Sequence, residues 1–189
     1  MIRLALLGDI GSGKSHIAKL FGYPIFNADL EVAKLYRSNS ACFKKIKKTF
    51  PKYFLTPPIK KNEIMKVILR NDNNLKKITK IIHPEIRKKM NIFLKKNKKK
   101  NFLVLDIPLL LENKINKKRD IIIFVESKKS EIIKRLKKRK NFNLRLFKRF
   151  KNIQLPLDYK KKKSHFIIKN DFTNSSIKDS IRIILKEIL

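Results

Sequence analysis

The chain has 189 residues, 42% of them hydrophobic, which is enough to build the core of one domain. Lysine and arginine number 49 against 15 acidic residues, giving a net charge of +34. The basic residues are spread along the chain without a nucleic-acid-reading motif, so we expect no specific nucleic-acid partner. Codon bias in an AT-rich genome is a sufficient explanation of the excess, although the charge can still speed the approach of anionic substrates.

Two further features concern the compartment. The longest apolar run, residues 102–111, is interrupted by Asp106 and Pro108 and is too short to span a bilayer. The apolar start, residues 1–7, lacks the length of a signal peptide, and Cys42 is the only cysteine. We therefore expect a cytoplasmic protein with no membrane partner, while the sequence leaves the oligomeric state unknown.

The first half of the chain opens with alternating apolar segments and then becomes helical. The run at residues 2–7 ends at a glycine turn, as a buried parallel strand does. A helix, a short strand and a second helix are then predicted at 15–21, 24–26 and 30–36. Helical periodicity continues over residues 38–95, with interruptions expected at Pro51, at Pro57 and Pro58, and at Pro84.

The second half returns to strands. Residues 102–107, 121–125 and 166–168 are rich in β-branched and apolar side chains and are predicted to be strands. Ser127 is placed to cap the helix that follows the second of them, and the chain ends in an amphipathic helix. Strands alternating with helices predict an α/β fold with a central parallel sheet, and without repeats or a linker we assign residues 1–189 to a single domain.

The most specific motif is the segment Gly8–Ser15, which fits the phosphate-loop pattern G-x-x-x-x-G-K-[ST] and lies between a predicted strand and helix. Glycines let backbone N–H groups approach phosphates closely, and the helix N-terminus adds partial positive charge there. Lys14 is expected to bridge the β- and γ-phosphates of ATP, and the Ser15 hydroxyl to ligate Mg²⁺. The ATP-binding residues expected from this motif are Gly11, Ser12, Gly13, Lys14, Ser15 and His16.

Several segments in order resemble those of dephospho-CoA kinases. They are Leu6–Ser15, Asn27–Asp29, Ile81–Pro84, Val104–Asn113, Gln154 and Ile167–Asn170. The resemblance implies a P-loop kinase fold, a three-layer α/β/α arrangement with a central parallel sheet, a helical substrate-side insertion and a basic lid. The helical region corresponds to about residues 30–95 and the lid to about 128–160. It also implies transfer of phosphate from ATP to the 3′-hydroxyl of dephospho-CoA, the last step of coenzyme A synthesis, with Mg²⁺ as cofactor.

Two carboxylates are candidates for the chemistry. Asp29 follows the second strand, where it can accept the proton of the substrate hydroxyl, and capping of the next helix is the alternative role. Asp106 closes the strongest strand, where it can hold Mg²⁺, and a purely structural carboxylate is equally compatible with that position.

The resemblance also assigns an acceptor wall and a lid arginine. His83, Pro108, Leu109 and Glu112 are expected to bind the acceptor substrate; the alternatives are capping or packing for His83 and a place in the core for Leu109. Arg139 aligns with the lid arginine of the family and is expected to stabilise charge on the transferring phosphoryl group. In so basic a chain, a generic solvated arginine is the competing interpretation.

This sequence departs from the family pattern at His16, where threonine is usual, and at Asn27, where aspartate is usual. These changes bear on lid and adenine contacts and leave the expected phosphate chemistry intact, since Lys14, Ser15 and Asp29 are retained. The alternatives are another small-molecule or nucleoside monophosphate kinase, a nucleic-acid-associated P-loop protein, and a non-catalytic relative.

Overall fold

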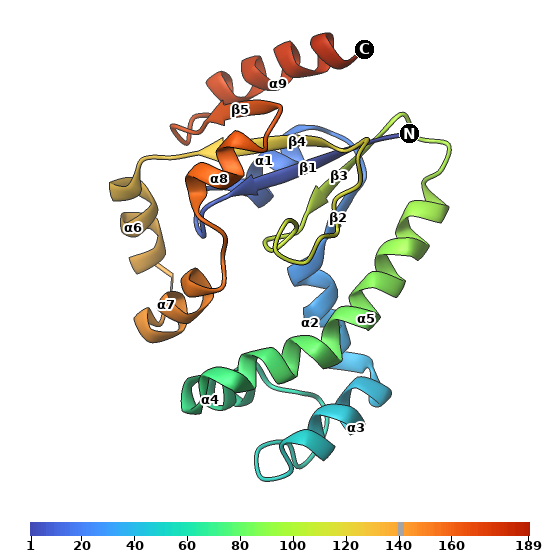
Figure 1. Ribbon diagram of the computed structural model, residues 1–189, viewed down its shortest axis with the longest axis vertical. Coiled ribbons are helices and arrows are strands. Elements are labelled where there is room, and N and C mark those ends of the chain that lie inside the picture. The colour runs from blue at the N-terminus through green and yellow to red at the C-terminus, as the bar shows by residue number, and fades with distance from the viewer. Residues whose placement is uncertain (140–141) are drawn as a thin grey trace. The chain divides into compact units, whose positions relative to one another are not determined.

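The computed structural model describes residues 1–139 and 142–189, so the expected lid, residues 128–160, includes two residues outside the described part (Figure 1). The chain forms two compact units. The first comprises Met1–Asn27, Asn97–Phe142 and Lys151–Leu189, and the second Ala28–Lys96 and Asn143–Phe150. The assignment of residues 1–189 to a single domain stays a prediction. None of the described helices is long and apolar enough to cross a membrane.

The first unit is built on a parallel sheet of five strands in the order β2-β3-β1-β4-β5. The strands are β1 (Ile2–Gly8), β2 (Ile25–Asn27), β3 (Phe102–Asp106), β4 (Ile121–Glu126) and β5 (Phe166–Lys169). β1 pairs with β3 from Ile2↔Phe102 and with β4 up to Gly8↔Val125, so both of its edges are covered. This position explains its unbroken apolar sequence, because a strand that is covered by helices on both faces has no polar side. The α/β prediction with a parallel sheet is confirmed.

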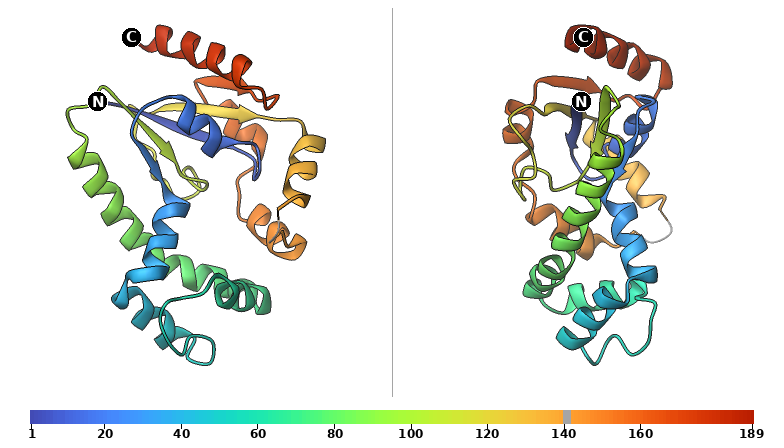
Figure 2. Two further views of the ribbon diagram at one scale, coloured as in Figure 1. Left: turned by 180° about the vertical axis from the view of Figure 1, so that it is seen from behind. Right: turned by 90° about the vertical axis from the view of Figure 1, so that its right-hand side faces the viewer.

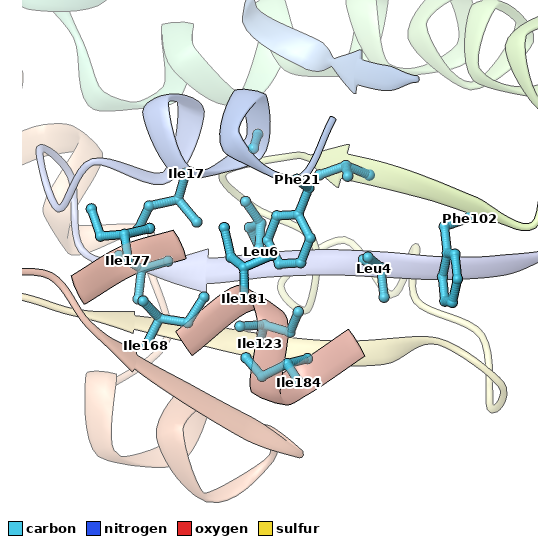
Figure 3. Packing of buried hydrophobic residues seen from close by; sticks show 13 residues of the cluster. Leu4, Leu6, Ile17, Phe21, Phe102, Ile123, Ile168, Ile177, Ile181 and Ile184 are labelled. Carbon is cyan, nitrogen blue, oxygen red and sulfur yellow. The ribbon is translucent and has the colours of Figure 1, made fainter. Parts of the chain in front are cut away.

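Helices on one face of the sheet build the core of the first unit. α1 (Lys14–Leu20) and α9 (Asn174–Ile188) bury Ile17, Phe21 and a stripe of isoleucines from α9 against Leu4 and Leu6 (Figure 3). Ile177, Ile181 and Ile184 make up that stripe at helical spacing. α8 (Leu157–Lys162) packs against β1 on the face opposite α1, as Figure 1 and the reverse view in Figure 2 (left) show. α6 (Lys129–Lys137) follows β4.

The second unit is helical. It contains α2 (Ala28–Ser38), α3 (Ser40–Thr49), α4 (Lys61–Arg70) and α5 (Asp72–Lys96), and most of the basic helix α7 (Leu144–Asn152). The long helix α5 contacts α2, α3 and α4, and the buried side chains of Ile46, Phe54 and Val67 lie in this unit.

Two local predictions were wrong. Pro84 does not interrupt the helix but lies inside α5, which tolerates the one lost backbone hydrogen bond because neighbouring helices pack along it. Ser127 does not cap α6, whose N-cap is Lys128 without a side-chain bond. The Ser127 hydroxyl instead donates to the Ser12 carbonyl at 3.0 Å, because a partner distant in sequence offers a bond that local propensity cannot anticipate.

Candidate active site

The phosphate loop connects the end of β1 at Gly8 with the start of α1 at Lys14. Gly13 caps the helix with φ of 92°, a left-handed conformation in which side chains are strained. A Cβ at this position would also lie 2.3 Å from Nδ2 of Asn170. Position 13 therefore requires glycine both for its backbone conformation and for the close approach of Asn170.

The Lys14 ammonium is held over the loop by the loop's own backbone. The residue is only 8% exposed, and Nζ donates to the carbonyl oxygens of Gly8 at 3.1 Å and Asp9 at 2.7 Å. These bonds fix a positive charge beside the N-terminus of α1, where the helix dipole adds partial positive charge. The loop thus combines a cation with backbone donors, which is the chemistry that binds phosphate groups.

Side chains from distant parts of the first unit support the loop from behind. The Ser12 carbonyl accepts from Nδ2 of Asn170 at 2.7 Å as well as from Ser127. Oδ1 of Asn170 in turn accepts from the backbone N–H of Phe172 at 2.8 Å. Asn170 belongs to a segment that resembles the family, but its supporting role follows only from its burial, at 5% exposure, and its hydrogen bonds.

One side chain of the loop and one of α1 make contacts that the motif did not predict. Asp9 accepts from its neighbour Ile10 N–H at 2.7 Å and forms an ion pair with Lys151, which belongs to the expected lid segment. The His16 ring places Nε2 2.7 Å from Oδ1 of Asn174, at the start of α9. His16 therefore links α1 to α9, and its expected contact with ATP stays a prediction.

Asp106 lies at the carboxyl end of β3, next to Asn27 on β2 in the strand register. It is 2% exposed, and its Oδ2 accepts from Nδ2 of Asn27 at 2.5 Å. The substitution of the usual aspartate by Asn27 therefore replaces a second carboxylate with a donor that binds the remaining one. Ser15, in the first turn of α1, keeps an exposed hydroxyl.

The residues after β3 that are expected to bind the acceptor lie in the first unit. Pro108 and Leu109 are half-buried, whereas the neighbouring Leu110 is fully buried in the core. Glu112 forms an ion pair with Lys160 at 2.6 Å and accepts from the Leu155 N–H at 3.0 Å.

A hollow of about 570 Å³ lies between the carboxyl ends of β4 and β5. Its lining comes from Glu126–Lys128, Glu131 and Lys169–Phe172. The guanidinium carbon of Arg135 on α6 lies 4.2 Å from the centre of the Phe172 ring, a stacked cation–π pair at the rim. Arg139, just after α6, is exposed and donates its backbone N–H to the Leu136 carbonyl.

The second unit holds the other two predicted residues. Asp29 is exposed and is the second residue of α2, so it lies in the first turn and not at the N-cap. A carboxylate in the first turn interacts favourably with the helix dipole. His83 lies on α5, where burial, aided by the positive charge of Arg87, lowers the pKa of the imidazole. His83 is therefore biased towards its neutral form.

Among the described residues there is no group of three or more His, Cys, Asp or Glu side chains that could hold a metal ion. The oxygen donors near the phosphate loop that suit Mg²⁺ are the Ser15 hydroxyl and the Asp106 carboxylate. Such a sparse set fits an ion that keeps most of its waters and binds together with substrate phosphates.

Comparison with known proteins identifies the family of the chain. A family model described as dephospho-CoA kinase matches residues 2–177. A dephospho-CoA kinase of Wolbachia pipientis wMel is 32% identical over 187 residues, covering 94% of this chain and 95% of the relative. Two solved structures share the fold. TT1252 from Thermus thermophilus has a TM-score of 0.77 and 21% identity, and the match covers 100% of this chain and 98% of that one. A dephospho-CoA kinase from Campylobacter jejuni has a TM-score of 0.66 and 24% identity, and the match covers 98% of this chain and 96% of that one. The chain therefore belongs to the dephospho-CoA kinase family.

Proposed function

We propose that this chain transfers the γ-phosphoryl group of ATP to the 3′-hydroxyl of dephospho-CoA, giving CoA and ADP, the last step of coenzyme A synthesis. The observation that carries the proposal is the family match along residues 2–177. In the reaction the 3′-oxygen bonds to the γ-phosphorus, the bond to the β–γ bridging oxygen breaks, and the hydroxyl proton leaves. Little covalent chemistry falls to the protein, whose task is positioning and charge stabilisation.

Lys14 supplies the central positive charge. Its ammonium exchanges the Gly8 and Asp9 carbonyls for the β- and γ-phosphate oxygens of ATP, while the amides of Gly11–Ser15 surround the phosphates. Because phosphate oxygens are charged, the new bonds are stronger than those to backbone carbonyls. Ser12 contributes through its supported backbone, and His16 extends the site if its ring leaves Asn174.

Asp29 orients the acceptor hydroxyl and takes its proton. Its carboxylate is exposed at the first turn of α2, two residues after Asn27 in the chain, and is therefore accessible to a ligand. Proton transfer by a positioned carboxylate contributes about 10²- to 10⁴-fold to rates of this type.

Ser15 and Asp106 would hold Mg²⁺, directly or through water. The ion would supply positive charge to neutralise the phosphates of ATP. Asp106 is kept in place by the amide of Asn27, which leaves its other oxygen, Oδ1, for this role.

The base of ATP occupies the hollow at the ends of β4 and β5, beside the stacked pair Arg135 and Phe172. Arg139, on the segment that follows α6, stabilises the transferring phosphoryl group when the lid closes. The ion pair of Lys151 with Asp9 ties the far end of this segment to the phosphate loop.

His83, Pro108, Leu109 and Glu112 bind the acceptor. The depressed pKa of His83 favours a neutral ring, which can both donate and accept a hydrogen bond. Pro108 and Leu109 offer half-buried apolar surface, and Glu112 offers a carboxylate.

The substrates are thus the small molecules ATP and dephospho-CoA. We place the protein in the cytoplasm, where ATP is abundant, with no specific nucleic-acid or membrane partner. Binding of duplex or single-stranded DNA at about 150 mM salt tests the nucleic-acid alternative. Tight binding would support it, whereas a generic polyelectrolyte attraction is lost because it weakens steeply with salt.

A coupled ADP-release assay with Mg-ATP tests the function. The acceptors are dephospho-CoA, AMP, CMP, shikimate and none. We expect ADP release that depends on dephospho-CoA, with CoA identified by mass spectrometry. Release with a different acceptor alone would overturn the substrate, and no release with any acceptor would overturn the enzymatic role.

A further inference from the structure

Two ion pairs of the first unit are buried, judged over its described residues. In one, Arg3 and Asp120 have side chains that are 7% and 2% exposed. In the other, Lys160 and Glu112 are 0% and 10% exposed. Removing charges from water is costly unless all their hydrogen-bonding groups are satisfied, so the two pairs can be compared by that criterion.

In the Arg3–Asp120 pair, both carboxylate oxygens accept hydrogen bonds. Nε of Arg3 donates to Oδ1 of Asp120 at 2.6 Å, and the second guanidinium bond goes to Oδ2. Oδ2 also accepts from the backbone N–H of Lys117 at 2.8 Å. The pair lies where β1 and β4 begin, at the edge of the sheet opposite the phosphate loop. Its geometry is that of a structural clamp.

The Lys160–Glu112 pair is different because one of its oxygens is left over. Oε1 of Glu112 lies 2.6 Å from Nζ of Lys160 and also accepts from the Leu155 N–H. Oε2 is buried and has no hydrogen-bond partner among the described residues, and the same holds for Oε1 of the neighbouring Gln154. Lys160 is fully buried and can donate three hydrogen bonds, so the cluster has both donors and acceptors that are not used in hydrogen bonds.

Such leftover capacity needs an explanation, because nearly all buried polar groups in proteins are paired. Glu112 lies in the loop that follows β3, whose last residue is Asp106. This loop leaves the carboxyl edge of the sheet, the edge at which β1 enters the phosphate loop and at which ligands of parallel α/β sheets bind. A carboxylate oxygen there is suited to accept from a hydroxyl or amino group of a bound nucleotide.

We propose that Lys160 is a positioning residue for the acceptor substrate: it fixes Glu112 through Oε1, so that Oε2 accepts a hydrogen bond from an O–H or N–H group of that substrate. The proposal rests on the proposed function and adds a residue to it. Lys160 is on α8, which packs against β1, so the ammonium is anchored by the core rather than by a mobile surface side chain. Loss of a hydrogen bond to a charged group weakens binding by about 10- to 100-fold.

The test measures KM and kcat for dephospho-CoA and for ATP, direct binding of dephospho-CoA by calorimetry, and urea unfolding. The variants are Lys160→Met, Glu112→Gln and the double replacement Lys160→Met with Glu112→Leu. The matched control is Arg3→Met with Asp120→Leu, which removes the other buried pair. An apolar pair of similar size commonly keeps the stability of the buried ion pair it replaces, so the double variant separates folding from binding.

We expect Lys160→Met and Glu112→Gln to raise the KM for dephospho-CoA by about 10- to 100-fold, with the KM for ATP changed by less than about threefold. The double variant should unfold near the wild-type urea concentration yet keep the raised KM. The control should leave both KM values unchanged whatever it does to stability.

A double variant with wild-type affinity for dephospho-CoA would overturn the proposal and leave the pair as a structural one. Equal weakening of ATP and dephospho-CoA would overturn it as well. If Lys160→Met fails to fold, wild-type affinity for dephospho-CoA in the double variant still overturns the proposal, because that variant lacks both Lys160 and Glu112. A wild-type protein that neither binds nor turns over dephospho-CoA would instead refute the proposed function. Calorimetry on the wild-type protein detects this outcome separately from the effects of the variants.

Discussion

The two units carry their functional residues in opposite ways. In the first unit, Lys14 and Asp106 are at most 8% exposed and are held by backbone or side-chain hydrogen bonds. In the second unit, Asp29 is exposed on the first turn of a helix and His83 is half-buried on another. The first unit thus holds these side chains by hydrogen bonds in its interior, while the second presents an exposed carboxylate and a half-buried ring.

This difference determines how substitutions are to be interpreted. A buried, hydrogen-bonded residue contributes to stability as well as to chemistry, so its loss changes both. An exposed residue in a helix contributes mainly through what it touches in the complex. Activity and unfolding measured on the same variants therefore separate the two kinds of residue.

Lys14→Ala is expected to have the largest effect. Removing the ammonium eliminates charge stabilisation at the transferring group, and we expect turnover to fall by about 10³-fold or more. Because Lys14 is buried and bonded to Gly8 and Asp9, the free energy of unfolding should change too. Lys19→Ala, an exposed lysine in the last turn of the same helix, is the control and should keep wild-type turnover. Comparable activity in the two variants would contradict the role of Lys14.

Asp29→Asn comes next and represents the second unit. Turnover should fall by about 10²- to 10⁴-fold because the carboxylate no longer accepts the hydroxyl proton. Nucleotide affinity and the free energy of unfolding should stay within about 0.5 kcal/mol, as for other surface substitutions. Glu31→Gln removes the other carboxylate of the same helical turn and serves as the control. An Asp29→Asn enzyme as active as wild type would exclude the proposed role.

The same contrast explains what could be predicted from the sequence. The phosphate loop, its strand and its helix depend on a short contiguous pattern, so Gly8–Ser15 was placed correctly. The parallel sheet followed from apolar runs that are local as well. Asp29 and His83 were assigned by resemblance alone, and their roles stay predictions.

Contacts between distant residues could not be predicted. Asn170 hydrogen-bonds to Ser12, 158 residues away in the sequence, and Lys160 forms an ion pair with Glu112, 48 residues away (160 − 112). No local pattern marks such partners, and in a chain with 49 basic residues a buried lysine looks like any other. Pro84 shows the converse: its local signal was clear, and tertiary packing of α5 overrode it.

Gly13→Ala tests the rigidity of the first unit and should have a moderate effect. The new methyl group meets Asn170 Nδ2 at 2.3 Å and holds the residue at φ of 92°, so we expect a loss of about 2–4 kcal/mol in the free energy of unfolding. Gly22→Ala is the matched control, because its φ is 73° and nothing lies within 4 Å of the added carbon. It should lose only about 1 kcal/mol, the cost of the backbone conformation. Urea unfolding of both variants gives the difference, and equal losses would mean that the loop yields to the methyl group.

The smallest expected effect is the pH dependence contributed by His83 in the second unit. Burial and the nearby charge of Arg87 lower the pKa of its imidazole in the folded chain below the ordinary value of 6.5. Between these two pKa values the unfolded chain binds a proton that the folded chain does not. The free energy of unfolding should therefore fall as the pH drops through 6.5 towards the folded-state pKa, and level off below it.

His83→Gln removes the titrating group, so its stability relative to wild type should improve as the pH is lowered through this window. Urea unfolding between about pH 5 and pH 8 measures this, with NMR titration of His83 as a direct readout. Arg87→Gln removes only the neighbouring charge and should raise the pKa of His83 part of the way, because burial is the larger cause. A wild-type curve parallel to that of His83→Gln would mean that the ring is solvated in the folded chain, and that the second unit is as open at His83 as it is at Asp29.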